Sequence, residues 1–113
     1  MELREAKLII PLDGCGDAIP YAEEFILAQW GGFTAALCDG AWRDDLGQII
    51  REPSRVYTIA MEPNGDSRVK LHRLGAIVAD MGRQNCVYVR HASGIVELVN
   101  AGQRYPWAGK VTG

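Results

Sequence analysis

The sequence predicts an α+β protein of the ferredoxin-like type, with two helices on one face of an antiparallel sheet. Three observations lead to this prediction. Short runs rich in branched and aromatic residues alternate with longer segments whose apolar residues recur every three to four positions. Glycines and capping residues mark the ends of both helical segments. The resulting order, strand–helix–strand–strand–helix–strand, is the split βαβ arrangement, and one further strand follows it.

The first strand is expected over residues 7–12 and the first helix directly after it. The strand residues KLIIPL are apolar on both faces, which is typical of a central strand. Asp17 is the expected N-cap of the helix, and Pro20 falls in its first turn, where a missing N–H costs little. Gly31-Gly32 is expected to stop the helix with a left-handed C-cap.

Residues 33–62 are expected to form a long hairpin whose tip extends beyond the sheet. The second strand covers residues 33–38, and Asp39-Gly40 is expected to break or bulge it. The segment from Asp44 to Gly47 carries a turn signal. Residues 48–51 return along the hairpin, Pro53 is expected to interrupt them, and the third strand covers residues 55–62.

The second half of the chain predicts a helix and a short hairpin. Asp66 or Ser67 is expected to cap the helix, and Gly82 to end it. The fourth strand covers residues 85–91, Ser93-Gly94 fits a tight two-residue turn, and the fifth strand covers residues 95–99. Residues 100–113 form an irregular tail. We expect one domain over residues 1–113, with a regular core at about residues 6–99.

Composition excludes several classes of protein. The chain has 113 residues, of which 48% are hydrophobic and 23% charged, as in ordinary globular domains. Its net charge of −2 and pI of about 5.6 give no basic face for nucleic acid. The three cysteines form no CxxC pair, which argues against a zinc site and fits reduced thiols. No signal peptide or membrane span is evident, so we expect a cytoplasmic protein. We also expect it to act without a metal or cofactor.

The predicted fold leaves one face of the sheet without helices. The first and third strands, which would be central, nevertheless carry apolar residues on both faces. A large open apolar patch usually marks an interface, so we expect a homodimer that packs sheet against sheet or shares strands. The tail, with Tyr105 and Trp107, is the alternative cover for that face.

Part of the sequence resembles small uncharacterised bacterial and phage proteins in which a helix ends in a Gly-Gly-Phe-Thr-like strand start and a long hairpin follows. The resemblance covers about residues 8–98 and rests on Trp30-Gly-Gly-Phe-Thr34, Gly40-Ala-Trp42 and Glu52-Pro53. It implies a fold and transfers no catalytic residue. The order of elements is also similar to that of dimeric α+β barrel proteins, a group that includes cofactor-free monooxygenases, isomerases and ligand-binding modules.

Four residues are candidates for chemistry. His91, at the end of the fourth strand, is a candidate acid or base, and Tyr57 and Tyr88 are candidate polar groups in a pocket between sheet and helices. Cys15 is expected to be a buried, reduced thiol in a strand-to-helix turn; the alternative is a candidate nucleophile whose pKa is lowered by the nearby helix start. His72 is expected to be a partly exposed surface histidine, because it lies off the apolar face of its helix.

The leading hypothesis is a protein that acts by association rather than catalysis. It would be a homodimer that binds a small ligand or another protein through Trp42 on the hairpin arm and through Tyr105 and Trp107 in the tail. One alternative is a small cofactor-independent enzyme of the dimeric α+β barrel type. Another is an inhibitor encoded by a phage or mobile element that acts by surface binding.

Overall fold

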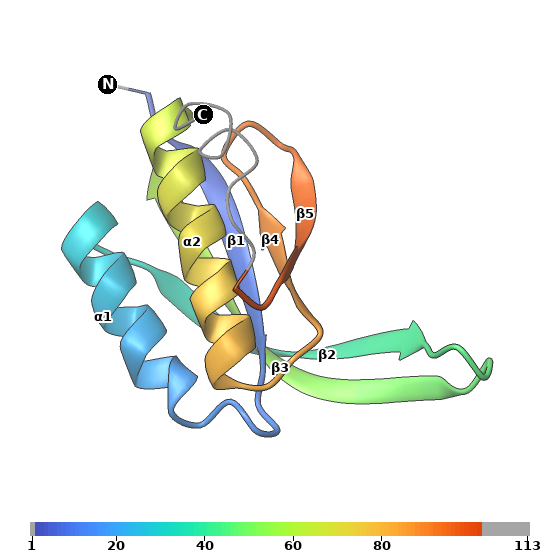
Figure 1. Ribbon diagram of the computed structural model, residues 1–113. Coiled ribbons are helices and arrows are strands. Elements are labelled where there is room, and N and C mark those ends of the chain that lie inside the picture. Colours follow the sequence, from blue (N-terminus) through green and yellow to red (C-terminus); the bar gives the residue numbers. More distant parts are fainter. Residues whose placement is uncertain (1, 103–113) are drawn as a thin grey trace.

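A computed structural model describes residues 2–102. Figure 1 shows two helices lying over a five-stranded sheet. In chain order the elements are β1 (Arg4–Pro11), α1 (Ala18–Trp30), β2 (Thr34–Arg43), β3 (Ile49–Met61), α2 (Gly65–Met81), β4 (Cys86–Arg90) and β5 (Val96–Asn100). The strands lie in the order β2-β3-β1-β4-β5, and every neighbouring pair is antiparallel. The predicted ferredoxin-like fold is confirmed, with β5 added at one edge.

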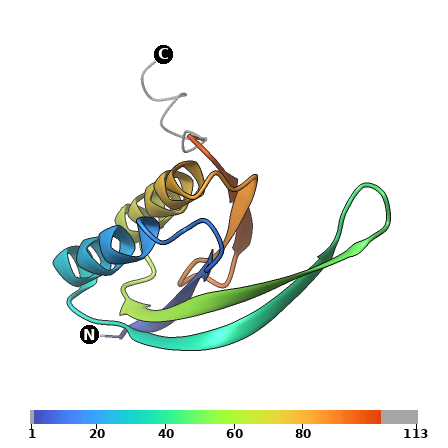
Figure 2. The ribbon, with the colours of Figure 1, turned by 90° about the horizontal axis from the view of Figure 1, so that it is seen from below.

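Both helices cover the same face of the sheet, as Figure 2 shows. The core lies between these layers. Leu8 and Ile10 of β1 and Tyr57 and Ile59 of β3 are fully buried there. Alternate residues of the same strands, such as Ile9, point to the opposite face, since successive side chains of a strand alternate. The helix-free face therefore carries apolar side chains, as expected from the sequence.

The ends of α1 follow the expected signals in part. Gly31 has φ +84° and donates its N–H to the carbonyl of Leu27, so it is the predicted left-handed C-cap. Asp17 occupies the N-cap position, but its side chain makes no capping hydrogen bond. The first amides of the helix are instead satisfied by the carbonyl of Cys15, which accepts from Ala18 and Ile19.

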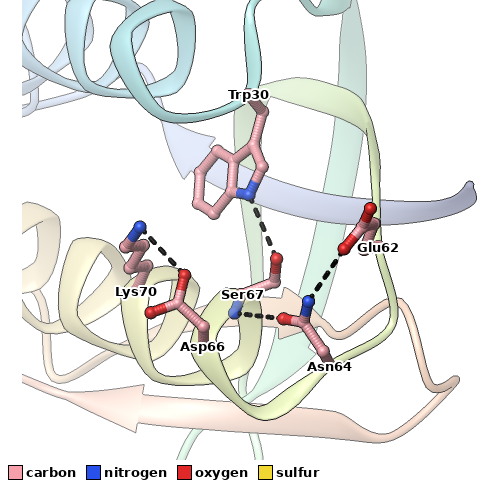
Figure 3. Close-up of polar contacts among 6 residues, drawn as sticks. All are labelled: Trp30, Glu62, Asn64, Asp66, Ser67 and Lys70. Carbon is pink, nitrogen blue, oxygen red and sulfur yellow. Dashed lines mark hydrogen bonds and ion pairs between the residues drawn. The ribbon is translucent and has the colours of Figure 1, made fainter.

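The helix α2 begins earlier than expected, and Asn64 rather than Asp66 or Ser67 is its N-cap. The Oδ1 atom of Asn64 accepts the backbone N–H of Ser67 at 2.9 Å, and its Nδ2 donates to Glu62 (Figure 3). Asp66 lies in the first turn, where the helix dipole favours a negative charge. Figure 3 also shows the Ser67 hydroxyl facing Trp30 of α1, whose indole N–H donates to it at 3.4 Å. The prediction failed because the sequence holds several good capping residues in a row.

The hairpin of β2 and β3 is continuous, so the breaks expected at Asp39-Gly40 and Pro53 are absent. The ladder runs unbroken from Thr34 opposite Thr58 to Arg43 opposite Ile49. Pro53 is tolerated because its carbonyl accepts the N–H of Leu12, which shows that its nitrogen also faces away from β2. Residues 39–53 form the arm, which projects beyond the end of β1 in Figures 1 and 2.

The turn between β4 and β5 holds three residues rather than the predicted two. The N–H of His91 donates to the carbonyl of Ile95, and the N–H of Gly94 donates back to His91. Gly94 has φ +95°, the conformation that a three-residue hairpin loop requires at this position. The expected glycine turn is therefore present, with one extra residue.

Candidate functional site

The helix-free face contains a groove of about 530 Å³ at the base of the arm. Side chains from all five strands and from the loop before β4 line it. Its apolar wall includes Ile9, Trp42, Tyr88 and Leu98. Trp42 and Leu98 remain 47% and 63% exposed, so the described residues leave much of this wall uncovered. Such concave, mainly apolar sites are typical of small-molecule binding.

A few polar groups lie along the same groove. Glu52, from the arm, contributes a carboxylate, while Gln84 and Asn85 contribute amides from the loop before β4. The hydroxyl of Ser54 is held by the backbone carbonyl of Glu52, to which it donates at 3.1 Å. An apolar wall with one carboxylate and a few neutral hydrogen-bonding groups suits a flat ligand that carries a positive charge.

Of the candidate polar residues, Tyr88 lies in this groove and Tyr57 does not. Tyr57 is buried under the helices and donates its hydroxyl hydrogen to Glu23 of α1 at 2.6 Å. Burial and then the Glu23 carboxylate raise the pKa of Tyr57 above its usual value, so its hydroxyl stays protonated. The groove also lies on the opposite side of the sheet from the expected pocket, because core side chains fill the space under the helices.

The two histidines form a cluster with Glu97, which the sequence analysis did not single out. His91 Nε2 is hydrogen-bonded to Oε1 of Glu97, and His72 Nδ1 lies 3.3 Å from Oε2 of the same carboxylate. Both histidine side chains are almost completely buried. The expectation of a surface His72 was wrong: α2 packs against β4 and β5 on that side too. A polar residue beside the apolar stripe of a helix is also buried when further strands of the sheet cover that side of the helix.

The environment of His91 disfavours its charged form. Burial lowers the pKa of His91, and the hydrogen bond to Glu97 offsets this only in part. The charges of Arg68 and His72 lower it further. His91 also borders a smaller cavity of about 160 Å³ at the N-terminus of α2. Because Glu97 engages its Nε2, the ring is held as a structural link between α2 and the last two strands.

Cys15 is a buried thiol, as the main prediction had it, and its pKa is not lowered as the nucleophile alternative required. Its side chain is buried, and burial raises the pKa of the thiol, assisted by the negative charges of Glu52 and Asp13. A thiol in this state is a poor nucleophile at neutral pH, because the thiolate is the reactive form. The dipole of a helix falls off within a turn and is outweighed here by desolvation.

The remaining candidates fall in two places. Trp42 lies on the arm, as predicted, and faces the groove. Tyr105 and Trp107 lie outside the described residues. Within residues 2–102, no three His, Cys, Asp or Glu side chains are arranged to hold a metal ion. The same part of the chain contains no helix that is both long and apolar enough to cross a membrane.

Sequence reasoning missed most of the groove. The sequence predicts a solvated role for Glu52 and a strand start at Asn85, and no spacing around these residues or Gln84 signals a site. Their common location arises when the arm, the end of β1 and the loop before β4 meet at one end of the sheet. These residues come together only through the pairing register of three pairs of strands, which the sequence alone does not give.

Comparison with known proteins gives likeness in structure and none in sequence. No protein-family model and no curated protein matches the chain. A phage SAM lyase in complex with S-methyl-5'-thioadenosine shares the fold with a TM-score of 0.70 at 18% identity, covering 91% of this chain and 93% of that chain. The same kind of enzyme in its apo state gives a TM-score of 0.67 at 18% identity, with 89% and 91% covered. The fold is therefore one that a small phage protein also adopts.

Proposed function

We propose that this chain binds S-adenosylmethionine (SAM) in the open-face groove and cleaves it as a lyase. The observation that carries the proposal is the chemistry of the groove: two aromatic side chains and one carboxylate on a wall that is otherwise apolar. The likeness to a SAM lyase over nine-tenths of both chains supports it. Of the alternatives that the sequence left open, the cofactor-independent enzyme fits this groove best.

The ligand matches the groove group by group. A purine ring is flat and stacks well on aromatic side chains, for which Trp42 and Tyr88 are available. The sulfonium centre of SAM is a cation without N–H or O–H donors, so aromatic faces and a nearby carboxylate such as Glu52 are the groups that attract it. Gln84 and Asn85 supply amides for the ribose hydroxyls or the amino acid end.

The reaction needs no cofactor. When the bond between the sulfonium sulfur and the amino acid carbon breaks, the sulfur keeps the electron pair and leaves as a neutral thioether, S-methyl-5'-thioadenosine. The other fragment loses a proton as a double bond forms, or closes on its own carboxylate, so no oxidant or water is consumed. The protein's part is to bind and orient SAM, and desolvation in an apolar groove favours loss of the cationic charge.

Calorimetry with two ligands, followed by chromatography of SAM incubated with the protein, tests the proposal. Both SAM and S-methyl-5'-thioadenosine should bind, and the thioether should accumulate from SAM. Trp42→Ala should weaken both ligands by roughly ten- to a hundredfold, the usual effect of removing a stacked aromatic. Glu52→Gln should weaken the cation SAM by about tenfold and leave the neutral thioether unchanged, because only the charge interaction is lost.

Leu46→Ala is the matched control, since Leu46 is an exposed apolar residue of the arm outside the groove. It should bind both ligands as the natural sequence does. The proposal fails if neither nucleoside binds, or if Trp42→Ala and Leu46→Ala behave alike.

The exposed apolar residues of the arm support a second proposal, that the chain associates with itself. Leu37, Leu46 and Ile49 are 73%, 83% and 60% exposed, and all three lie at the arm or beside its base. A two-stranded ribbon that leaves its sheet is marginally stable in water, and exposed apolar residues of this size usually mark contact with another protein. We propose that a second copy of the chain covers this side of the arm, which leaves Trp42 free to line the groove. A surface-binding inhibitor would use the same residues toward a different protein.

A further inference from the structure

We propose that Lys7 and Arg90 bind the carboxylate at the amino acid end of SAM, and that the chain thereby distinguishes SAM from nucleosides that lack this group. This role rests on the proposed function, because it names the part of that ligand which the sheet beside the groove recognises. It also orients the ligand: the base lies toward the arm, and the amino acid end lies over β1 and β4.

The two cations lie directly opposite each other on the helix-free face, next to the groove. Lys7 of β1 pairs with Arg90 of β4, and the next pair along these strands on the same face is Ile9 with Tyr88. Ile9 and Tyr88 both line the groove. Residues two apart on a strand point to the same side and lie about 7 Å apart. Lys7 and Arg90 therefore border the groove at the end away from the arm.

No described residue neutralises this pair of charges. Like charges directly opposite each other destabilise an antiparallel ladder. Among residues 2–102, no carboxylate lies within ion-pair distance of Lys7 or Arg90. Glu5, the nearest acidic residue on this face along β1, lies opposite Ala60 and makes no ion pair with Lys7. The fold thus keeps two adjacent positive charges on one face of a chain whose net charge is −2, and this favours an anionic ligand.

The groups on this face follow one another in the order of the parts of SAM. Trp42 lies opposite Ile50 of β3, and Glu52 follows two residues later on the same face. Lys7 lies opposite Thr58, further along β3 in the same direction. Passing from the arm into the sheet, the face presents an aromatic ring, a carboxylate and then the pair of cations. SAM carries its flat base, its sulfonium and its carboxylate in this order, so each part can meet a group that attracts it. The two amides of the groove are then left for the ribose hydroxyls.

Calorimetry with three nucleosides tests this role. S-adenosylhomocysteine keeps the carboxylate of SAM but has a neutral sulfur, so it reports on the amino acid end without being cleaved. Arg90→Gln and Lys7→Gln should each weaken the binding of SAM and of S-adenosylhomocysteine by about tenfold, because a charge-assisted hydrogen bond to the carboxylate is lost. S-methyl-5'-thioadenosine has no carboxylate and should bind both variants as it binds the natural chain.

Two further variants serve as controls for the same titrations. Arg73→Gln, at an exposed arginine of α2 on the other side of the sheet, should change no affinity. Glu52→Gln should weaken SAM alone, because S-adenosylhomocysteine carries no sulfonium. The carboxylate and the sulfonium are thus followed separately.

Urea denaturation separates binding from a structural role of the pair. Because Arg90→Gln removes a repulsion between like charges, it should leave the midpoint of denaturation unchanged or raise it. A lower midpoint together with unchanged affinities would overturn the binding role and make the pair a structural feature of the sheet.

The titrations also distinguish failure of this role from failure of the proposed function. If the three nucleosides bind and neither variant weakens the two that carry a carboxylate, the role of Lys7 and Arg90 is wrong and the proposed function stands. An equal loss for S-methyl-5'-thioadenosine would also overturn the role, because the variants would then act on the groove as a whole. If no nucleoside binds the natural chain, the proposed function fails and this role fails with it.

Discussion

At the scale of the residue, Cys15 and Gly82 meet where the loop before α1 touches the end of α2. A Cβ atom on Gly82 would overlap the Sγ of Cys15 and come within 3.3 Å of the carbonyl of Val78. Gly82 has φ −89°, which any residue adopts, so packing and not backbone conformation requires a glycine here. The glycine thus permits the loop and the helix end to come into contact.

Gly82→Ala should therefore lower the free energy of unfolding by about 1–3 kcal/mol, the usual cost of overpacking a core. In a Cys15→Ala background the same substitution should cost less than half as much, because the overlapping sulfur is gone. Urea denaturation of the four proteins measures this coupling. Gly16→Ala, whose Cβ would have no neighbour within 4 Å, is the control and should change stability little. Equal costs of Gly82→Ala in both backgrounds would show that Cys15 is not the obstacle.

The sequence indicated that Gly82 ends a helix, but not which residue it contacts. A glycine after an apolar periodic segment is a local signal, and it was confirmed. The contact with Cys15 joins two segments far apart in the chain, so it follows only from how helix and sheet pack. The same limit explains why the nucleophile alternative for Cys15 was wrong, since burial by distant residues outweighs the effect of a nearby helix end on its pKa.

At the scale of the element, the cluster of His72, His91 and Glu97 joins α2 to the hairpin of β4 and β5. His72 and Arg68 face it from α2, His91 from the end of β4, and Glu97 from β5. One carboxylate serves two buried imidazoles, and burial disfavours the charged form of His91. These two strands and the helix are thereby linked through buried polar groups, and His91 makes that link sensitive to pH.

The pKa shift of His91 determines whether the stability of this junction rises or falls as the pH is lowered. The folded state lowers the pKa of His91 below its ordinary value of 6.5, so the unfolded chain binds more protons as the pH falls. Stability is therefore full above about pH 6.5 and declines as the pH falls through the folded pKa, by up to about 1.4 kcal/mol per pH unit for one group. Denaturation at several pH values between neutrality and mild acid measures this slope.

His91→Gln should make the slope shallower, whatever its effect on stability at neutral pH. Ser93→Ala, an exposed change in the same turn, should keep the natural slope. A slope that is identical in the natural chain and in His91→Gln would mean that other groups dominate the pH dependence.

The existence and order of the elements were predictable, while several boundaries were not. Periodicity of the apolar residues marked both helices and all five strands. Pro53 and Asp39-Gly40 misled because a proline is excluded from a strand only where its nitrogen must donate, and that depends on which neighbour the strand has. The N-cap at Asn64 was missed because several adjacent residues can each cap a helix, and the sequence does not show which of them does.

At the scale of the whole molecule, chain order and right-handed crossovers were enough to predict that β1 and β3 are central and that both helices cover one face, while the place of β5 beside β4 was left open. The groove was not predictable, because it requires the arm to run past β1 without a break. That continuity also gives the arm two exposed sides. One side lines the groove with Trp42, and the other presents Ile49, with Leu37 beside the base of the arm on the same side.

A second copy on that other side of the arm should make the 12.4 kDa chain a dimer in solution. Leu37 and Ile49 both point to the helix side of the β2–β3 ribbon, Leu37 beside the base of the arm and Ile49 toward its tip, and no described helix covers either of them. Replacing both with Asp should give monomers, because an unpaired carboxylate cannot be buried in an apolar contact without a large cost. Ile95→Asp, at another exposed apolar residue next to the β4–β5 turn, is the control and should leave the mass unchanged. Light scattering across a dilution series measures the mass of each protein, with circular dichroism to verify the fold. A natural chain that is monomeric at every concentration would exclude the dimer and leave the arm as a surface for a different protein.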